Sequence, residues 1–312
     1  MRVTTKMFYD TFLSDMQKNM SIIFKANEQI SSNKKVNRPS DDSAAMSRIL
    51  AYKAQLSSNS DYGKAVDSAA SNLEAIDSAL SNLNDLLIRA KELAMQSGNG
   101  IVDAPKREML AAEVDQILQA AIGIANTRVA DRYIFSGYQS DSIPIDSTTG
   151  AYQRDGNDVE VAINPDVNVR INMPASELFS DTTTDFTAGP PAVYADPDTY
   201  VLEALHALKT ALEEPNDTIA ATAIQTAMGY LNNVSNNLSE RMADVGALLH
   251  RLDQESKYQE DRDYNLTLNL SRDQDADIAK AASELAQKQT ALQALRTSSA
   301  QILNTSLFDF IS

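Results

Sequence analysis

The most regular pattern in this chain is the run VDSAASNLEAIDSALSNLNDLLIRAKELA, which occupies residues 66–94. Its apolar and small side chains recur at alternating steps of three and four: Val66, Ala69, Leu73, Ile76, Leu80, Leu83, Leu87, Ala90 and Ala94. This spacing, kept over about four heptads, is typical of a coiled-coil seam. Because no proline interrupts residues 43–97, we expect one helix of about 80 Å at 1.5 Å per residue.

A second helix is predicted to fold back on the first. Gly98 and Gly100 end the long helix, and Pro105 stands where a new helix can begin. The stripe then continues at Leu110, Val114, Ile117, Ala121 and Ile124. A short connection favours antiparallel packing, so we expect residues 104–128 to cover most of the seam within the chain.

Both ends of the chain also carry helical stripes. Residues 5–32 place Phe12, Met16, Met20, Ile23 and Ile30 on one face. Asn33 suits the left-handed conformation that ends helices, and Ser40, Asp41 or Asp42 can cap the helix that follows Pro39. In the second half we predict helices over residues 198–213 and 218–270, and a last helix after Asp275 with a stripe at Ala281, Leu285, Leu292, Leu295 and Ile302.

The middle of the chain lacks helical periodicity. Gly, Pro, Asp, Thr and Ser are frequent over residues 137–192, and two alternating runs, 159–163 and 167–171, flank Asn164-Pro165-Asp166. This pattern predicts a small β-rich insert with at least one hairpin. The expected fold class is mainly α with a small β insert, an antiparallel helical rod built from both termini. The expected domains are an N-terminal assembly helix and turn, the first half of the rod, the β-rich outer domain, the second half of the rod and a C-terminal assembly helix, over residues 1–42, 43–136, 137–196, 197–272 and 273–312.

Composition excludes several classes of protein. The chain has no Cys, so disulfides and thiolate metal sites are excluded. Residues 137–199 hold two Arg against eleven Asp and Glu, within a net charge of −16, which disfavours binding to nucleic acid. The first ten residues have no continuous apolar core, and no apolar run approaches the roughly 20 residues of a membrane span. We therefore expect neither a cleavable signal peptide nor membrane insertion.

Candidate chemical sites are weak. Asp273, Asp275, Asp277 and Glu284 match four positions of a calcium-binding EF-hand loop, but Ile278 stands where that loop needs Gly. We interpret these carboxylates as helix N-terminal charge and caps. The two histidines, His206 and His250, lie far apart in the sequence, and no phosphate loop or nucleophile motif occurs. The sequence predicts a protein that is not an enzyme, with no cofactor, metal or catalytic residue.

The terminal stripes and the turn between the first two helices are the expected assembly interface. Long amphipathic helices at chain ends need partners for their apolar faces. We expect the two ends to pair with each other and with neighbouring copies. The turn can be either a capped turn within the chain or the site of a salt bridge to a neighbour. The interface residues are Phe12, Met16, Ile23, Ile30, Arg38, Asp41, Asp42, Leu285, Leu292, Leu295, Ile302, Leu307, Phe308 and Phe310.

Several motifs resemble those of a known family. Residues 31–45, SSNKKVNRPSDDSAA, are similar to a signature of bacterial flagellins and their hook-associated relatives, although many flagellins have Gly in place of Asn33. Residues 125–128, ANTR, followed by 132–138, RYIFSGY, resemble the hook–filament junction members of the family. The ending SLFDFI at residues 306–311 also resembles those members more than flagellin itself. The matches cover residues 1–138 and 240–312 and leave out the insert.

The resemblance implies a structural role in the bacterial flagellum. A junction member forms an adaptor ring between hook and filament, on which flagellin polymerises; the alternative is a flagellin, the filament subunit. The implied partners are copies of itself, the adjacent hook-associated junction subunit, flagellin and an export chaperone that holds the C-terminal helix. The implied location is outside the cell, at the hook–filament junction, reached by flagellar type III export without a cleaved signal.

Overall fold

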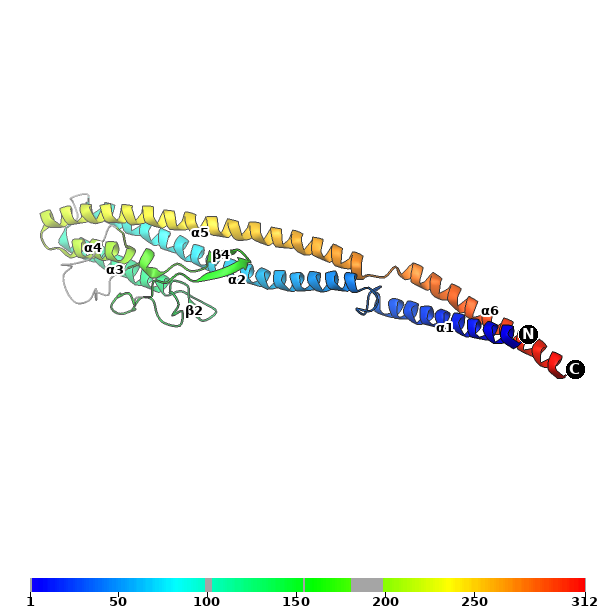
Figure 1. The fold of residues 1–312 in the computed structure, drawn as a ribbon. Coiled ribbons are helices and arrows are strands. Elements are labelled where there is room, and N and C mark those ends of the chain that lie inside the picture. Colours follow the sequence, from blue (N-terminus) through cyan, green and yellow to red (C-terminus); the bar gives the residue numbers. More distant parts are fainter. Residues whose placement is uncertain (1, 99–102, 154, 181–198, 312) are drawn as a thin grey trace. The chain divides into compact units, whose positions relative to one another are not determined.

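A computed structural model describes the backbone of residues 2–98, 103–153, 155–180 and 199–311, with side chains except at residues 2–6, 8 and 300–311. The chain divides into two compact units. We call residues 1–59 and 260–312 the terminal unit and residues 60–259 the central unit. The elements are α1 (Arg2–Ser32), α2 (Ser43–Gly98), α3 (Ala104–Ala125), β1 (Arg128–Val129), β2 (Arg132–Tyr133), β3 (Glu160–Asn164), β4 (Val167–Arg170), a 3-10 helix (Ala175–Glu177), α4 (Val201–Glu213), α5 (Asp217–Gln274) and α6 (Ile278–Ile311). The predicted class, mainly helical with a small β insert, is confirmed (Figure 1).

The heptad seam forms the core of the central unit. All nine of its residues are buried, from Val66 at 3% exposure to Ala94 at 0%. They belong to one apolar cluster with Val114, Ile117 and Ala121 of α3. Arg89, nine residues before the end of α2, binds Glu113, nine residues into α3, at 2.6 Å. The predicted antiparallel hairpin is therefore confirmed, and the seam is satisfied inside the chain.

Helix α3 buries a wider face than its predicted stripe. Ala111, Leu118 and Ile122 are buried in addition to Val114, Ile117 and Ala121 of that stripe, whereas Leu110 and Ile124 are half-buried. Helix α4 packs against α3 as a second neighbour. Lys209 of α4 binds Asp115 of α3 at 2.7 Å and fixes this pair. A helix with neighbours on two sides needs apolar residues over most of its circumference.

Helices α2 and α5 run antiparallel in the central unit (Figure 1). A Cβ on Gly63 would lie 3.5 Å from Oε1 of Gln259, and a Cβ on Gly98 would lie 4.0 Å from Ile224. The number of residues between the two positions on α2 equals the number between the two positions on α5. The register of the two helices is therefore the same at both contacts. Val234, Leu238 and Val245 extend the core along α5.

Two hairpins build the β-rich part. The predicted hairpin is confirmed: β3 pairs antiparallel with β4, with a bulge near Ala162. A tighter hairpin joins β1 to β2 through Ala130 and Asp131, which have φ of 47° and 65°. Two successive positive φ values suit the right-handed strand twist but are unusual for Ala.

Polar and aromatic contacts hold the insert together, and one hydrogen bond joins it to α5. Buried Asn172 donates to the carbonyls of Ser136 and Asn157 and accepts from the backbone N–H of Val159 at 2.8 Å. Phe135 and Phe179 meet edge to face, with centroids 4.8 Å apart. Gln259 of α5 donates to the Ile163 carbonyl of β3 at 2.8 Å. These groups are satisfied internally, as burial of polar atoms requires.

In the terminal unit, α1 and α6 lie side by side (Figure 1). Lys34 and Asp275 form an antiparallel bridge where the chain leaves α1 and enters α6, so the two helices run in opposite directions. Val36, Ala45 and Ile49 form a small apolar cluster of their own. Within the described parts of the chain, no helix combines the length and apolar character that a membrane crossing requires.

Candidate assembly interface

The predicted terminal stripes meet each other but remain incompletely covered. Of the predicted interface residues, Phe12, Met16, Ile23 and Ile30 of α1 and Leu285, Leu292 and Leu295 of α6 are all half-buried. A pair of helices covers only one side of each stripe, because each helix has a single neighbour along that length. The pairing of the two chain ends is therefore seen, and apolar surface remains available beside it.

Large apolar side chains also lie exposed on α1. Met7, Tyr9 and Phe24 have exposures of 70%, 51% and 67%. The backbone of α6 continues to Ile311, but the side chains of the predicted residues Ile302, Leu307, Phe308 and Phe310 lie outside the described ones.

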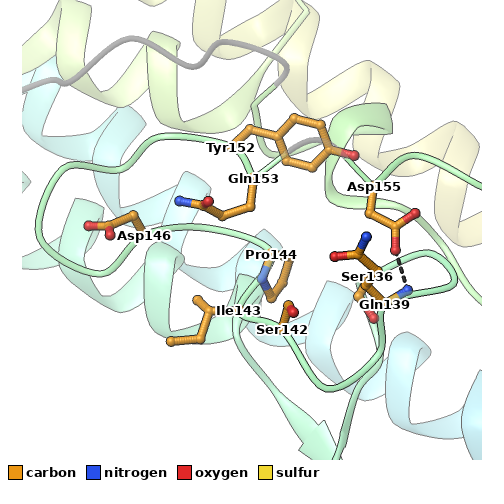
Figure 2. A pocket seen from close by; sticks show the side chains of 9 residues that line it. All are labelled: Ser136, Gln139, Ser142, Ile143, Pro144, Asp146, Tyr152, Gln153 and Asp155. Atoms are coloured by element: carbon orange, nitrogen blue, oxygen red, sulfur yellow. Dashed lines mark hydrogen bonds between the residues drawn. The ribbon is translucent and has the colours of Figure 1, made fainter.

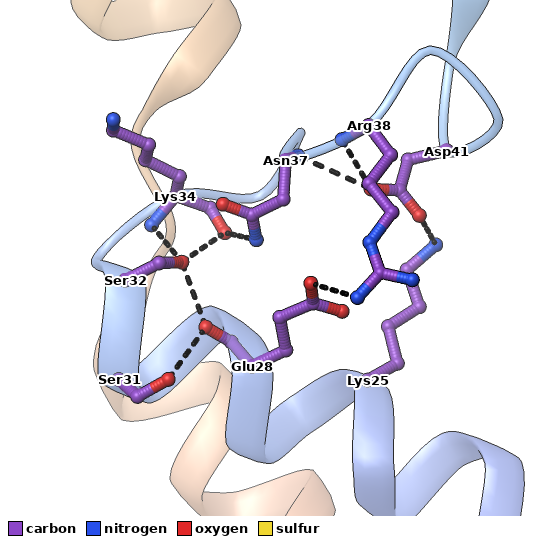
Figure 3. Close-up of polar contacts among 8 residues, drawn as sticks. All are labelled: Lys25, Glu28, Ser31, Ser32, Lys34, Asn37, Arg38 and Asp41. Carbon is purple, nitrogen blue, oxygen red and sulfur yellow. Dashed lines mark hydrogen bonds and ion pairs between the residues drawn. The ribbon is translucent and has the colours of Figure 1, made fainter.

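The turn between α1 and α2 is held by its own carboxylates (Figure 3). The Asp41 carboxylate accepts hydrogen bonds from the backbone N–H groups of Asn37 and Arg38 at 3.1 and 3.0 Å, and lies 3.6 Å from Lys25. These backbone hydrogen bonds, that of Arg38 first, lower the pKa of Asp41 below its ordinary value. Asp42 caps α2 by accepting from the Ala45 N–H at 2.9 Å. In the single chain, the turn is therefore capped by contacts within the chain, as the first of the two interpretations expects.

Arg38 differs from the two aspartates. Its guanidinium binds Glu28 of α1 at 2.9 Å, yet the Arg38 side chain is 69% exposed and the Glu28 side chain 37%. Such an exposed pair contributes little stability. The Arg38 side chain therefore remains open to a further partner on its outer side, whereas Asp41 and Asp42 already hold backbone N–H groups of this chain.

The two breaks in the helices of the terminal unit are bonded to each other, which sequence reasoning missed. The Lys35 N–H donates to the Gln274 carbonyl at 2.7 Å, and the Ala276 N–H donates to the Asn33 carbonyl at 3.0 Å. Asn33 has φ of 57°, the left-handed conformation predicted for it. Arg48 of α2 binds Asp273 of α5 at 2.7 Å and lowers the pKa of that carboxyl. The residues concerned lie more than 200 positions apart in the chain, so local pattern could not reveal their pairing.

Asp275 and Asp277 of the EF-hand-like pattern serve the helix ends, whereas Glu284 lies inside α6 and is exposed. Asp277 caps α6 by accepting from the Lys280 N–H at 3.0 Å, and Asp275 accepts from the Ser271 hydroxyl at 2.6 Å. The interpretation of Asp277 as a cap is thus confirmed. Among the described residues, no group of three or more His, Asp and Glu is placed to hold a metal ion.

The histidines do not form a joint site. His206 of α4 is buried, whereas His250 of α5 is exposed. Burial, and secondarily the charge of Lys209, lowers the pKa of His206 to about 4 against a smaller opposing effect of Asp115. His206 is therefore a neutral core residue near pH 7.

Comparison with known proteins identifies the relatives of this fold. Residues 3–140, which contain the turn of Figure 3 and the β1–β2 hairpin, match the bacterial flagellin N-terminal helical region. Flagellar hook-associated protein 3 of Salmonella typhimurium strain LT2 is 28% identical over 314 aligned residues, covering 99% of both chains. The chain is similar to flagellar hook-associated protein 3 along its whole length.

Other relatives are consistent with that similarity. The flagellar filament 41 kDa core protein of Borreliella burgdorferi is 23% identical over 75% of this chain and 76% of its own. The filament protein is thus the more distant relative. The crystal structure of the flagellar junction protein FlgL from Legionella pneumophila has the same fold, with a TM-score of 0.58 and 15% identity over 73% of this chain and 100% of that one. The resemblance inferred from the motifs is therefore confirmed.

Proposed function

We propose that this chain is a non-enzymatic structural subunit of the bacterial flagellum at the hook–filament junction, an adaptor ring on which flagellin polymerises. The observation that carries the proposal is similarity to hook-associated protein 3 over 99% of both chains. The filament relatives match over less of the chain and at lower identity, which favours the junction over the filament itself.

The terminal unit supplies the means of assembly in this proposal. Its α1–α6 pair leaves Phe12, Ile23 and Leu292 half-buried. Covering such side chains with a neighbouring copy contributes on the order of 1 kcal/mol each, since full burial of a large apolar side chain is worth about 1.5–3 kcal/mol. A ring that repeats these contacts gains stability at every interface, while the central unit needs no partner for its seam.

The proposed partners follow from the same surfaces. Copies of the chain cover the terminal stripes, and the adjacent hook-associated junction subunit and flagellin contact the two sides of the ring. An export chaperone holds α6 before assembly, and the chain reaches the junction outside the cell by flagellar export. The insert, residues 137–199, is acidic, which disfavours nucleic acid as a partner.

A deletion strain tests the junction role. We expect hooks without filaments by electron microscopy and full-length flagellin in the culture medium, both reversed by a plasmid that encodes this chain. Attached filaments of normal length would rule out the junction role. Loss of the major filament protein itself from the medium would instead identify the chain as a flagellin.

Matched substitutions test the terminal stripe. In the complemented strain, Leu292→Asp and Ile23→Asp should abolish filaments, because a charge cannot be buried unpaired at an interface. Gln289→Asp, at an exposed position of α6, introduces the same charge and should leave filaments intact. The variant chains must be found in the medium, which separates failure to assemble from failure of export. Normal filaments with Leu292→Asp and Ile23→Asp would refute the proposed interface.

A further inference from the structure

The two helix breaks of the terminal unit form a short clasp between the ends of the chain. We use this name for residues 33–36, which follow α1, and residues 274–276, which lead from α5 into α6. The Lys35 N–H donates to the Gln274 carbonyl, and the Ala276 N–H donates to the Asn33 carbonyl. Each of these bonds joins a residue that follows α1 to a residue that precedes α6. Helix α1 therefore ends, and helix α6 begins, at backbone segments that are bonded to each other.

The clasp is anchored to α2 and α5. Val36 is only 4% exposed and packs with Ala45 and Ile49 of α2. Leu270 of α5 packs against the same cluster. The Lys35 ammonium group donates to a main-chain carbonyl of α5 at 2.6 Å. Apolar burial and hydrogen bonds therefore both fix the clasp to the helices on its inner side.

Helices α1 and α6 are held less firmly than the clasp. Their stripes are half-buried, and each helix has the other as its neighbour. Helices take most of their stability in water from tertiary packing rather than from propensity. Because the packing of this pair is incomplete, the point at which the chain joins the two helices contributes to keeping them together and in register.

We propose that the clasp couples the two ends of the chain, so that α1 and α6 are ordered together while it is closed and released together when it opens. If either segment of the clasp moves away, the opposite segment loses its backbone partners as well. Given the proposed function, both stripes are then presented to neighbouring copies together or not at all. A partner that captures α6 alone thereby also releases α1.

Hydrogen exchange of the full chain, followed by mass spectrometry, tests the coupling through proline substitutions. Ala276→Pro removes the N–H that the Asn33 carbonyl accepts, and Lys35→Pro removes the N–H that the Gln274 carbonyl accepts. Neither residue has a positive φ, and each follows a residue of the extended bridge, which suits a following proline. Ala276→Pro should speed exchange about fivefold in α1 as well as in α6. Lys35→Pro, which also loses its ammonium contact, should speed exchange in α6 by at least that factor.

Ile278→Pro is the matched control for Ala276→Pro. It places the same ring two positions further along, at the first residue of α6. The N–H of a first helical residue has no partner within its helix, and proline is well tolerated there. Exchange of α1 should therefore stay unchanged in Ile278→Pro.

A disulfide across the clasp tests the coupling in the opposite direction. The two backbone bonds flank Lys34 and Asp275, which makes them a non-hydrogen-bonded pair with Cα atoms about 4.5 Å apart, within the range that disulfides span. The chain has no Cys, so Lys34→Cys with Asp275→Cys gives a single defined bond. Oxidation should slow exchange in both helices, and a reductant should restore it.

Three outcomes would overturn the proposal. One is an unsubstituted chain in which α1 or α6 exchanges without protection. Another is a proline effect confined to the helix beside the substitution, and the third is a disulfide that protects only the clasp itself. The inference relies on the proposed function only for the meaning of the two stripes. Because exchange is measured on the isolated chain and the junction role in the deletion strain, the two can fail separately.

Discussion

Leu83 and Leu292 lie in helical stripes of similar appearance, yet the two stripes have different surroundings. Leu83 belongs to the central unit and has 0% exposure, enclosed by α3 and by other core residues. Leu292 belongs to the terminal unit and is half-buried, with α1 as the neighbouring helix. Heptad spacing therefore shows that a helix face must be buried. The number of neighbouring helices decides whether the chain itself can bury that face completely. The stripe of the central unit is fully buried within the chain, and the stripes of the terminal unit are not.

The largest expected effect contrasts these two leucines directly. Leu83→Ala should lower the free energy of unfolding of the central unit by about 3 kcal/mol, because it leaves a cavity in a closed core. Leu292→Ala, the identical change at a half-open position, should cost the isolated chain less than about 1 kcal/mol. Hydrogen exchange followed by mass spectrometry on peptides from each unit measures both values. Equal costs at the two sites would remove the distinction between a closed and an open stripe.

The two units should lose stability at different pH values as the solution is acidified. His206 has a pKa of about 4 when folded and about 6.5 when unfolded. The unfolded chain therefore binds an extra proton between these values, and the central unit loses up to roughly 3 kcal/mol as the pH falls through this window. Asp41 and Asp273 of the terminal unit have pKa values below the ordinary 3.8, so their contribution is lost only below about pH 3.8.

Denaturant unfolding between about pH 7 and pH 3 checks this order. His206→Gln should flatten the dependence of the central unit between about pH 6.5 and pH 4 and leave the terminal unit unchanged. His250→Gln is the control, because His250 is exposed on α5. A slope that survives in His206→Gln would show that other groups carry the acid sensitivity of the core.

A smaller effect is expected where the insert is attached to α5. Glu177 binds Arg170 of β4 at 2.5 Å and Arg241 of α5 at 3.2 Å, with its side chain 21% exposed. Glu177→Gln should cost about 1–2 kcal/mol, because it removes one charge that serves two guanidinium groups. Asp244→Asn is the matched control: Asp244 lies 3.8 Å from the same Arg241 but is 62% exposed, and its loss should be close to neutral. Thermal melting compares the two variants. A Glu177→Gln chain as stable as the unsubstituted chain would show that the two ion pairs of Glu177 contribute no stability.

Much of the fold could be predicted from the sequence because helical periodicity and helix-ending residues are local signals. The seam around Leu83, the left-handed Asn33 and the β3–β4 hairpin are all confirmed. What could not be predicted depends on neighbours distant in the chain. Leu118 is buried outside the predicted stripe of α3, against which α4 packs as a second neighbour. The Lys35 N–H meets the Gln274 carbonyl, which lies more than 200 positions away in the chain.

The candidate interface shows the same limit. The stripe positions on α1 and α6 followed from spacing, but their half-burial depends on how many helices surround each one. The interface itself therefore stays a prediction. The pocket lined by Pro144, Tyr152 and Asp155 (Figure 2) could not be predicted from the sequence, because its wall is assembled from loop residues that no periodicity marks.

The smallest expected effects compare one left-handed residue in each unit. Ala130, in the β1–β2 turn, has φ of 47°, a conformation that costs a residue with a Cβ about 1 kcal/mol. Ala130→Gly should therefore stabilise the central unit by about 0.5–1 kcal/mol, whereas Ala247→Gly at an exposed helical position should destabilise it by about 1 kcal/mol. Asn33, with φ of 57°, already tolerates this conformation, so Asn33→Gly should be nearly neutral and Asn33→Ala should cost about 1 kcal/mol in the terminal unit. Melting curves of the four variants give the signs, and a destabilised Ala130→Gly chain would mean that the methyl group of Ala130 contributes more by packing than it loses by strain.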